Sequence, residues 1–244
     1  MTLTRRDFGR SVLAGVAATT LAGSGGCGAE DDGGTGGSAG AGGSAGTGGG
    51  GAAGSGGANA CTLYPQQAAG PFYLDLDQLR TDITESKAGA GLRVLIQVQD
   101  EACEPLKDLA VDLWHCDAVG VYSGFPGQLD GLDTTGETFL RGTQVTGADG
   151  TAQFESIYPG WYPGRTTHIH FKVHTSSTTE ATSQLYFPED VNAEVYATPP
   201  YDARGQKDTP NDLDGVAGGA LPPLAMVTGD AGQGYVATIV VTVA

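Results

Sequence analysis

The sequence contains few basic residues. Its 12 Lys and Arg stand against 28 Asp and Glu, which gives a formal net charge of −16. The basic residues do not gather into a patch or stripe along the chain. Proteins that bind nucleic acids neutralise phosphates with clustered Lys and Arg. The composition therefore argues against a nucleic acid as partner.

The N-terminal region has no hydrophobic run long enough for a membrane-spanning helix. The apolar run at residues 11–23 is shorter than the roughly 20 residues that such a helix needs. It follows the pair Arg5-Arg6 and is rich in small residues. This arrangement is typical of a twin-arginine signal peptide, here residues 1–27. We therefore expect the folded protein to be exported across a bacterial inner membrane, to the periplasm, the cell surface or the medium.

A lipid anchor and a linker are the next features of the chain. Cys27 stands where lipoproteins are processed, but Ser24 departs from the aliphatic residue usual three positions upstream. The sequence thus leaves open whether Cys27 carries lipid and tethers the protein to a membrane. Residues 28–57 contain sixteen glycines. A stretch with so little apolar surface cannot offset its ordering entropy, so we expect a flexible linker over residues 28–59.

Cysteine is scarce in the remaining domain, residues 60–244. It contains Cys61, Cys103 and Cys116. In an exported protein we expect one disulfide and one odd thiol, with the pairing undecided.

The domain also lacks amphipathic helical periodicity and internal repeats. Six segments instead alternate in the manner of strands, at residues 92–100, 109–117, 151–157, 168–175, 183–187 and 235–243. The sequence Ala-Asp-Gly at 148–150 predicts a hairpin-type connection. This pattern predicts an all-β sandwich or barrel. Residues 192–223 form a long irregular stretch, which is usually either functional or disordered.

Histidine is rare as well, and two of the four stand at His168 and His170. In a strand, positions i and i+2 share a face, so both imidazoles project together and suit two cis ligands of one metal. The spacing alone is weak evidence for a site. No His-x-Asp or His-x-Glu supplies the carboxylate of Fe(II) oxygenases, and Cys116 has no companion thiol at zinc spacing. Tyrosines surround the motif instead: Tyr122, Tyr158 and Tyr162.

Three segments decide the interpretation. VDLWHCDAVGVYSGF (111–125), FLRGTQVTGADGTAQFESIYPGWYPGRTTHIHFKV (139–173) and TSQLYF (182–187) together resemble the intradiol ring-cleavage dioxygenases, the family of the catechol and protocatechuate dioxygenases. The resemblance implies an exported single-domain member, a β-sandwich of mainly antiparallel strands with long connecting loops. It also implies cleavage of a catechol-type ring with O2 to a muconate-type dicarboxylate, both oxygen atoms entering the product.

The resemblance also implies a cofactor, a mononuclear non-haem Fe(III). By position in the motifs, its ligands would be Tyr122, Tyr162, His168 and His170. Phenolates are hard anionic donors that favour Fe(III), and the metal lowers the tyrosine pKa far below its free value of about 10. Tyr162 would be the ligand that the substrate displaces.

Further roles follow from the same motifs. Arg165 matches an arginine beside the substrate, which would stabilise negative charge on the ring, and Gln184 matches a glutamine near the metal. Phe72 and Tyr73 belong to a segment resembling a part of the substrate pocket. No catalytic residue of the family matches three other aromatic side chains, which we interpret as structural: His115, Tyr158 and His174.

Two departures from the family leave the substrate and the oligomeric state undecided. Five residues separate Tyr162 from His168, fewer than in the catechol and protocatechuate enzymes, and no helical dimerisation region precedes the domain. The expected partners are a small aromatic diol and O2. Two other interpretations stay open at this point: a non-catalytic β-sandwich binding module at the cell surface, and a Zn²⁺-dependent hydrolase that uses the same histidine pair.

Overall fold

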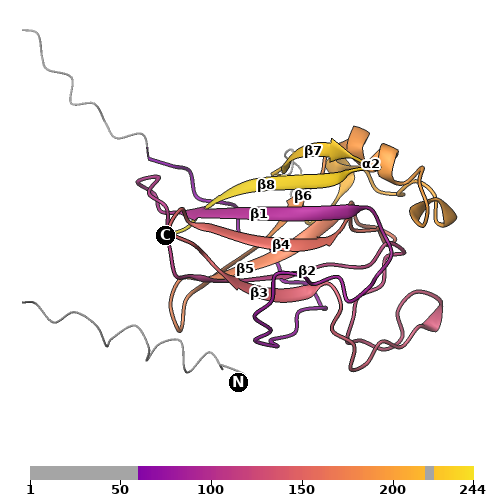
Figure 1. Cartoon of the computed structure of the whole chain (residues 1–244), viewed down its shortest axis with the longest axis horizontal. Coiled ribbons are helices and arrows are strands. Elements are labelled where there is room, and N and C mark those ends of the chain that lie inside the picture. The colour runs from indigo at the N-terminus through magenta and orange to yellow at the C-terminus, as the bar shows by residue number, and fades with distance from the viewer. Residues whose placement is uncertain (1–59, 218–222) are drawn as a thin grey trace, which may run out of the picture.

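The chain folds into two four-stranded sheets packed face to face (Figure 1). The computed structural model describes residues 60–217 and 223–244; the expected signal peptide and linker lie outside them. The strands are β1 Gly91–Gln99, β2 Ala110–Trp114, β3 Arg141–Val145, β4 Thr151–Ile157, β5 His168–His174, β6 Glu180–Tyr186, β7 Met226–Asp230 and β8 Gly234–Thr242. The short helices are α2 Glu189–Val195, η1 Leu129–Gly131, η2 Tyr201–Ala203 and η3 Asn211–Leu213.

The strand order confirms an all-β sandwich of mainly antiparallel strands. One sheet runs β4-β1-β8-β7 and the other β3-β2-β5-β6. All neighbouring pairs are antiparallel except β1 and β8, which are parallel. The six expected strands are present. β3 and β7 were not predicted, because each is five residues long and interrupted by a glycine.

The hairpin-type connection predicted at residues 148–150 is wrong. A tight turn does form there, with Gly150 N–H donating to Gly147 O at 3.0 Å. It links β3 to β4, however, and these strands belong to different sheets. Gly150 has a φ of +75°, and a Cβ there would lie 2.4 Å from the Val98 carbonyl oxygen. Glycine is thus required where the turn passes close to β1.

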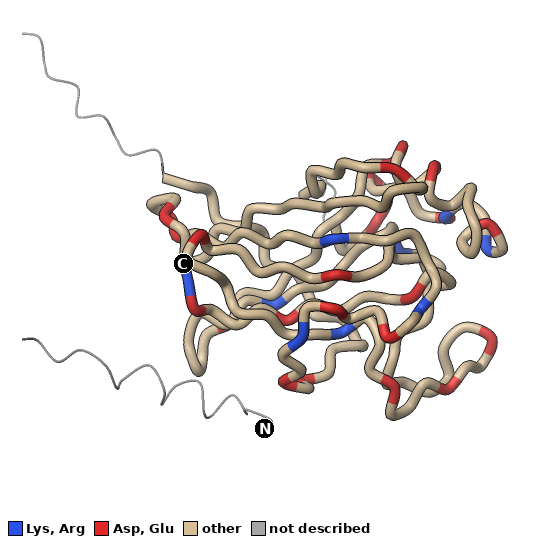
Figure 2. Tube along the Cα trace, viewed as in Figure 1, with Lys and Arg blue, Asp and Glu red and all other residues tan. Residues whose placement is uncertain are grey.

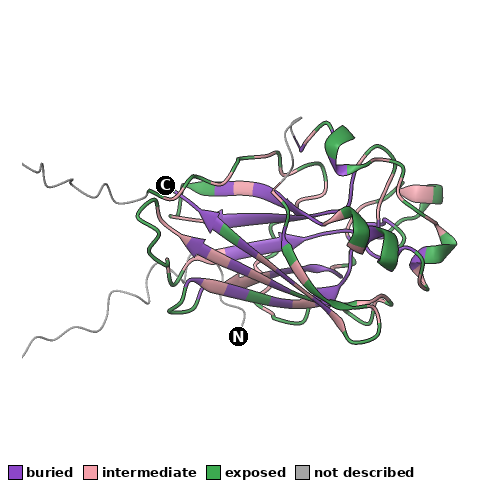
Figure 3. Cartoon of the chain, turned by 90° about the horizontal axis from the view of Figure 1, so that it is seen from above, coloured by how far each residue is buried: buried purple, intermediate pink, exposed green. Residues whose placement is uncertain are grey.

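Alternation in β5 separates the core from the site. Ile169, Phe171 and Val173 belong to the main core, together with the buried side chains of β1 and β8. Buried residues are concentrated in the strands of the two sheets (Figure 3). His168 and His170 occupy the opposite face of the same strand. That face is not left to solvent, since His168 is 3% and His170 2% exposed. A second buried cluster forms on it, built from Trp114, Cys116 and Tyr122 with Ala69, Phe72, Tyr73 and Tyr162.

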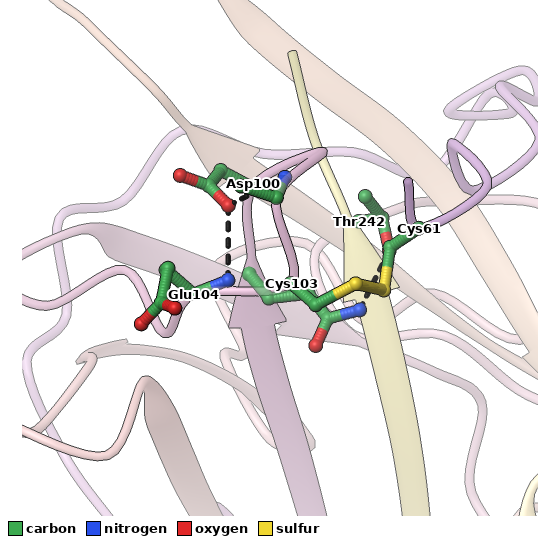
Figure 4. The surroundings of a disulfide bond; sticks show 7 residues. Cys61, Asp100, Cys103, Glu104 and Thr242 are labelled. Atoms are coloured by element: carbon green, nitrogen blue, oxygen red, sulfur yellow. Dashed lines mark hydrogen bonds between the residues drawn. A yellow bond between two sulfur atoms is a disulfide. The ribbon is translucent and has the colours of Figure 1, made fainter. Parts of the chain in front are cut away.

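The cysteines settle the pairing that the sequence left undecided. Cys61 and Cys103 form a disulfide, and Cys116 is free and buried. The bridge joins the start of the described chain to the turn after β1, where Asp100 accepts from the Glu104 backbone N–H at 2.9 Å (Figure 4).

The loop after β2 and the segment from α2 to η3 lie at the end of the sandwich opposite the C terminus (Figure 1). Basic residues are scattered singly among more numerous acidic ones over the described part of the chain (Figure 2). None of the helices in that part is long and apolar enough to cross a membrane.

Candidate metal centre and active site

Four side chains from β5 and from the loops before β5 and after β2 meet at one end of the β3-β2-β5-β6 sheet. β5 begins with His168 and also carries His170, while Tyr122 lies in the loop after the neighbouring strand β2. Tyr162 lies in the loop that leads into β5. The Tyr162 Oη is 3.1 Å and the Tyr122 Oη 3.4 Å from His168 Nε2. The two imidazole centroids are 4.8 Å apart, with the rings nearly perpendicular.

A backbone contact sets the tautomer of His168. Its Nδ1 lies 2.6 Å from the Thr166 carbonyl oxygen, which can only accept, so the proton resides on Nδ1. The lone pair of Nε2 then faces the two tyrosine oxygens. Burial, reinforced by the nearby Arg165, lowers the pKa of His168 to about 3. Burial, reinforced by His168, also lowers the pKa of His170 well below its usual value. Both imidazoles are therefore neutral, the form in which histidine binds metals.

The tyrosines need a cation to ionise. Burial raises the pKa of Tyr122 well above 10, and Tyr162 adds to this increase. Burial likewise raises the pKa of Tyr162. Two phenols with raised pKa values that converge on a histidine lone pair suit a metal ion, whose charge favours the phenolate. Metal–ligand bonds of about 2.0–2.1 Å place adjacent donors roughly 3 Å apart, which the distances to His168 Nε2 match.

The four candidate metal ligands include two tyrosines, which distinguishes them from the usual zinc ligands. Within residues 60–217 and 223–244, no group of three or more His, Cys, Asp and Glu lies together where a metal could bind. Catalytic zinc sites usually take three protein ligands from those residue types. Two phenolates and two imidazoles form instead a hard, anionic donor set suited to Fe(III). The described residues therefore fit iron better than zinc.

The backbone of Tyr122 is held on both sides. Its N–H donates to Gln128 Oε1 at 2.7 Å, and its carbonyl accepts from Gln128 Nε2 at 2.6 Å and from Thr134 Oγ1 at 2.7 Å. The buried Arg141 donates to the carbonyls of Ser123 at 2.7 Å and Phe72 at 2.6 Å. These side chains fix the loop that presents Tyr122. Sequence reasoning missed them, because polar residues in a loop give no pattern.

Arg165 is locked beside the same atoms. Its Nε donates to Asp214 Oδ2 at 2.8 Å and its Nη2 to Gln184 Oε1 at 2.6 Å. Its Nη1 lies 3.4 Å from His168 Nε2 and 3.5 Å from Tyr162 Oη. Burial disfavours the charged guanidinium, but Tyr162 and Asp214 outweigh it and raise the pKa of Arg165. Asp214 was not predicted; the only sequence signal was the long irregular stretch at 192–223 in which it lies.

The two expected pocket residues have different aromatic neighbours. Phe72 stacks on Tyr122, with centroids 4.4 Å apart, and lies 6.4 Å from Tyr162. The ring of Tyr73 lies 4.8 Å from that of Trp114, and its hydroxyl donates to Asp112 Oδ2 at 2.8 Å. The structure thus brings Phe72 against Tyr122 and places Tyr73 against Trp114 in the same cluster.

The three residues expected to be structural have partners away from these four side chains. His115 is buried with its Nε2 2.7 Å from Ser156 Oγ, and burial lowers its pKa to about 4. The Tyr158 hydroxyl donates to Asn192 Oδ1 at 2.8 Å in the main core. His174 Nε2 lies 2.8 Å from Asp112 Oδ2.

Comparison with known proteins gives the family. A sequence model described as "Dioxygenase" matches residues 68–198, more than half of the chain. The chain belongs to the intradiol ring-cleavage dioxygenases. Among solved structures, the intradiol dioxygenase from Tetranychus urticae is 29% identical with a TM-score of 0.68, over 75% of this chain and 94% of that one. The dioxygenase domain of a carbohydrate-binding fusion protein from Streptomyces is 33% identical with a TM-score of 0.56, over 75% and 98%.

The matches to curated relatives cover a smaller part of the chain, about half of it. The protocatechuate 3,4-dioxygenase beta chain from Burkholderia cepacia is 33% identical over 132 residues, which cover 48% of this chain and 55% of that protein. A chlorocatechol 1,2-dioxygenase from Cupriavidus pinatubonensis is 27% identical over 141 residues. The chain spans about half the length of these relatives.

Proposed function

We propose that this protein is an Fe(III)-dependent intradiol dioxygenase that cleaves a catechol-type ring with O2 to a muconate-type dicarboxylate. The observation that carries the proposal is the approach of two phenol oxygens and a guanidinium nitrogen to the Nε2 atom of His168. Tyr122, Tyr162, His168 and His170 would hold the iron. The bound Fe(III) would take both catechol oxygens as ligands and make the ring reactive towards O2.

Tyr162 is the side chain best placed to take up a substrate proton. Both tyrosines lie in loops, but Tyr162 is partly exposed, whereas Tyr122 is fully buried and fixed through its backbone. A catechol that binds as a dianion must give up two protons to acceptors in the site. Burial raises the pKa of Tyr162, so a phenolate released there is a strong base. We assign to its Oη the acceptance of one of these protons.

Arg165 would stabilise negative charge on the ring. A guanidinium fixed in advance at the reacting group stabilises developing charge without the cost of reorienting itself. Asp214 and Gln184 hold Arg165 in this way on one side, and its Nη1 remains directed at the ligand atoms. Gln184 therefore acts through the orientation of Arg165.

Purified protein tests the proposal through its colour. Charge transfer from tyrosinate to Fe(III) should make the iron-loaded protein red-brown, whereas a zinc hydrolase or a metal-free binding module would be colourless. Oxygen uptake with catechol, protocatechuate, hydroxyquinol and caffeate then identifies the substrate. A colourless, iron-free preparation that stays inert after reconstitution with iron would contradict the proposal.

We further propose export by the twin-arginine route, with Cys27 as a candidate point of lipid attachment. Arg5-Arg6 before a short apolar run supports export. The Cys61–Cys103 disulfide supports it independently, since disulfides persist in oxidising compartments. The mass of the mature N-terminus tests both points: an unprocessed N-terminus contradicts export, and a processed one without lipid contradicts the anchor.

A further inference from the structure

The two histidines are held by different contacts. His168 is fixed by the hydrogen bond from its Nδ1 to the Thr166 carbonyl oxygen. The Nδ1 of His170 is buried and makes no hydrogen bond to any part of the chain that the structure describes. Its ring lies flat against Trp114 instead, with centroids 5.0 Å apart and planes inclined by 5°. The imidazole of His170 is thus held by a ring stack, whereas that of His168 is held by a hydrogen bond.

Strand pairing places the indole there. Trp114 ends β2 and lies opposite His170 of β5 in the antiparallel register, so both side chains share one face of the sheet. Trp114 is buried, and the ring of Tyr73 lies 4.8 Å from it. The Tyr73 hydroxyl is in turn bound to the buried carboxylate of Asp112. Trp114 therefore contacts Tyr73 as well as His170.

A glycine approaches other atoms of the same imidazole. A Cβ at Gly70 would lie 3.3 Å from His170 Cε1 and 3.7 Å from Nε2, and the φ of Gly70 is +69°. A side chain at this position would therefore press on Cε1 of the imidazole, and the positive φ disfavours any residue other than glycine. Trp114 and the bare backbone of Gly70 together form a slot for His170.

We propose that Trp114 is a positioning residue for His170, whose stack fixes the imidazole plane in place of a hydrogen bond. The inference rests on the proposed function, because it takes His170 as a metal ligand. Residues that orient a metal ligand typically contribute 10–100-fold to metal affinity. An imidazole bound to a cation carries part of the positive charge, and the face of an indole attracts positive charge. The stack therefore favours the metal-bound form as well as the orientation.

Iron affinity, measured by competition with a chelator, tests this role. Trp114→Leu, which removes the aromatic face, should weaken Fe(III) binding about 10–100-fold. Trp114→Phe keeps a ring and should lose less. Phe154→Leu is the matched control: this buried aromatic lies in β4 of the other sheet, so its loss should lower the melting temperature but leave iron affinity unchanged.

The metal-free protein provides a second readout that does not depend on iron. The imidazole resonances of four histidines can be assigned by nitrogen-15 NMR. In Trp114→Leu those of His170 should shift and broaden, while those of His168, held by Thr166, should stay in place. Unchanged His170 resonances in Trp114→Leu, or unchanged iron affinity, would overturn the inference. A wild-type protein that binds no iron would instead overturn the proposed function, while broadened His170 resonances in Trp114→Leu would still show that Trp114 holds the ring.

Discussion

The His168→Ala variant should purify without its iron, colourless, and with kcat/KM reduced at least about 10³-fold. The oxygens of Tyr122 and Tyr162 both lie close to His168 Nε2. The alanine variant lacks this nitrogen, so the two tyrosines and His170 no longer form a complete set of metal ligands. Without a cation, burial keeps the two phenols protonated. Metal analysis, the visible spectrum and oxygen uptake measure the three losses.

A histidine on the same face of the same strand provides the control. His174 bonds to Asp112 and Glu180 and to none of the proposed ligands in the contacts that the structure gives. His174→Ala should therefore retain iron and colour. Iron bound at wild-type stoichiometry with an unchanged spectrum in His168→Ala would remove this histidine from the ligand set.

The Arg165→Ala variant should keep its iron and lose about 10²–10³-fold in kcat, the usual cost of removing one charge-stabilising donor. Because the guanidinium serves the reacting ring more than the metal, the effect on KM should be smaller. Arg165→Ala leaves the buried Asp214 without its ion pair, which is destabilising in itself. The double variant with Asp214→Asn separates this loss of stability from the loss of kcat.

Two further arginine variants sharpen the result. Arg165→Lys keeps the charge but loses the planar guanidinium that donates to both Asp214 and Gln184. Its kcat should therefore be little higher than that of Arg165→Ala. Arg93→Ala removes an arginine that pairs with Glu155 on the outside of the other sheet. This control variant should keep the wild-type iron content and kcat. Wild-type kcat in iron-loaded Arg165→Ala would show that this residue has no part in the reaction.

Local pattern predicted the strands but not their partners. Alternation in β5 placed His168 and His170 on one face, and the structure agrees. It could not show that this face is buried, because the cover comes from the distant segment around Phe72 and Tyr73. The turn at 148–150 was recognised from its residues, but which sheet each flanking strand joins depends on long-range pairing.

Some residues of the site could likewise be predicted from the sequence, and others could not. The sequence has nine tyrosines, and the resemblance alone selected Tyr122 and Tyr162, whose oxygens the structure places near His168. Asp214 stands 49 residues after Arg165, and only the packing of an irregular segment brings them together. Trp114 meets His170 through strand register, which no single-strand pattern reveals.

Intradiol cleavage is tested most directly by mass spectrometry of the product that the iron-loaded protein forms from a catechol under isotopically labelled dioxygen. Intradiol cleavage should give a muconate-type dicarboxylate, opened between the two hydroxylated carbons, that carries both labelled oxygen atoms. A product opened outside the diol, a product with label in one position, or no product from any catechol of the panel would contradict it.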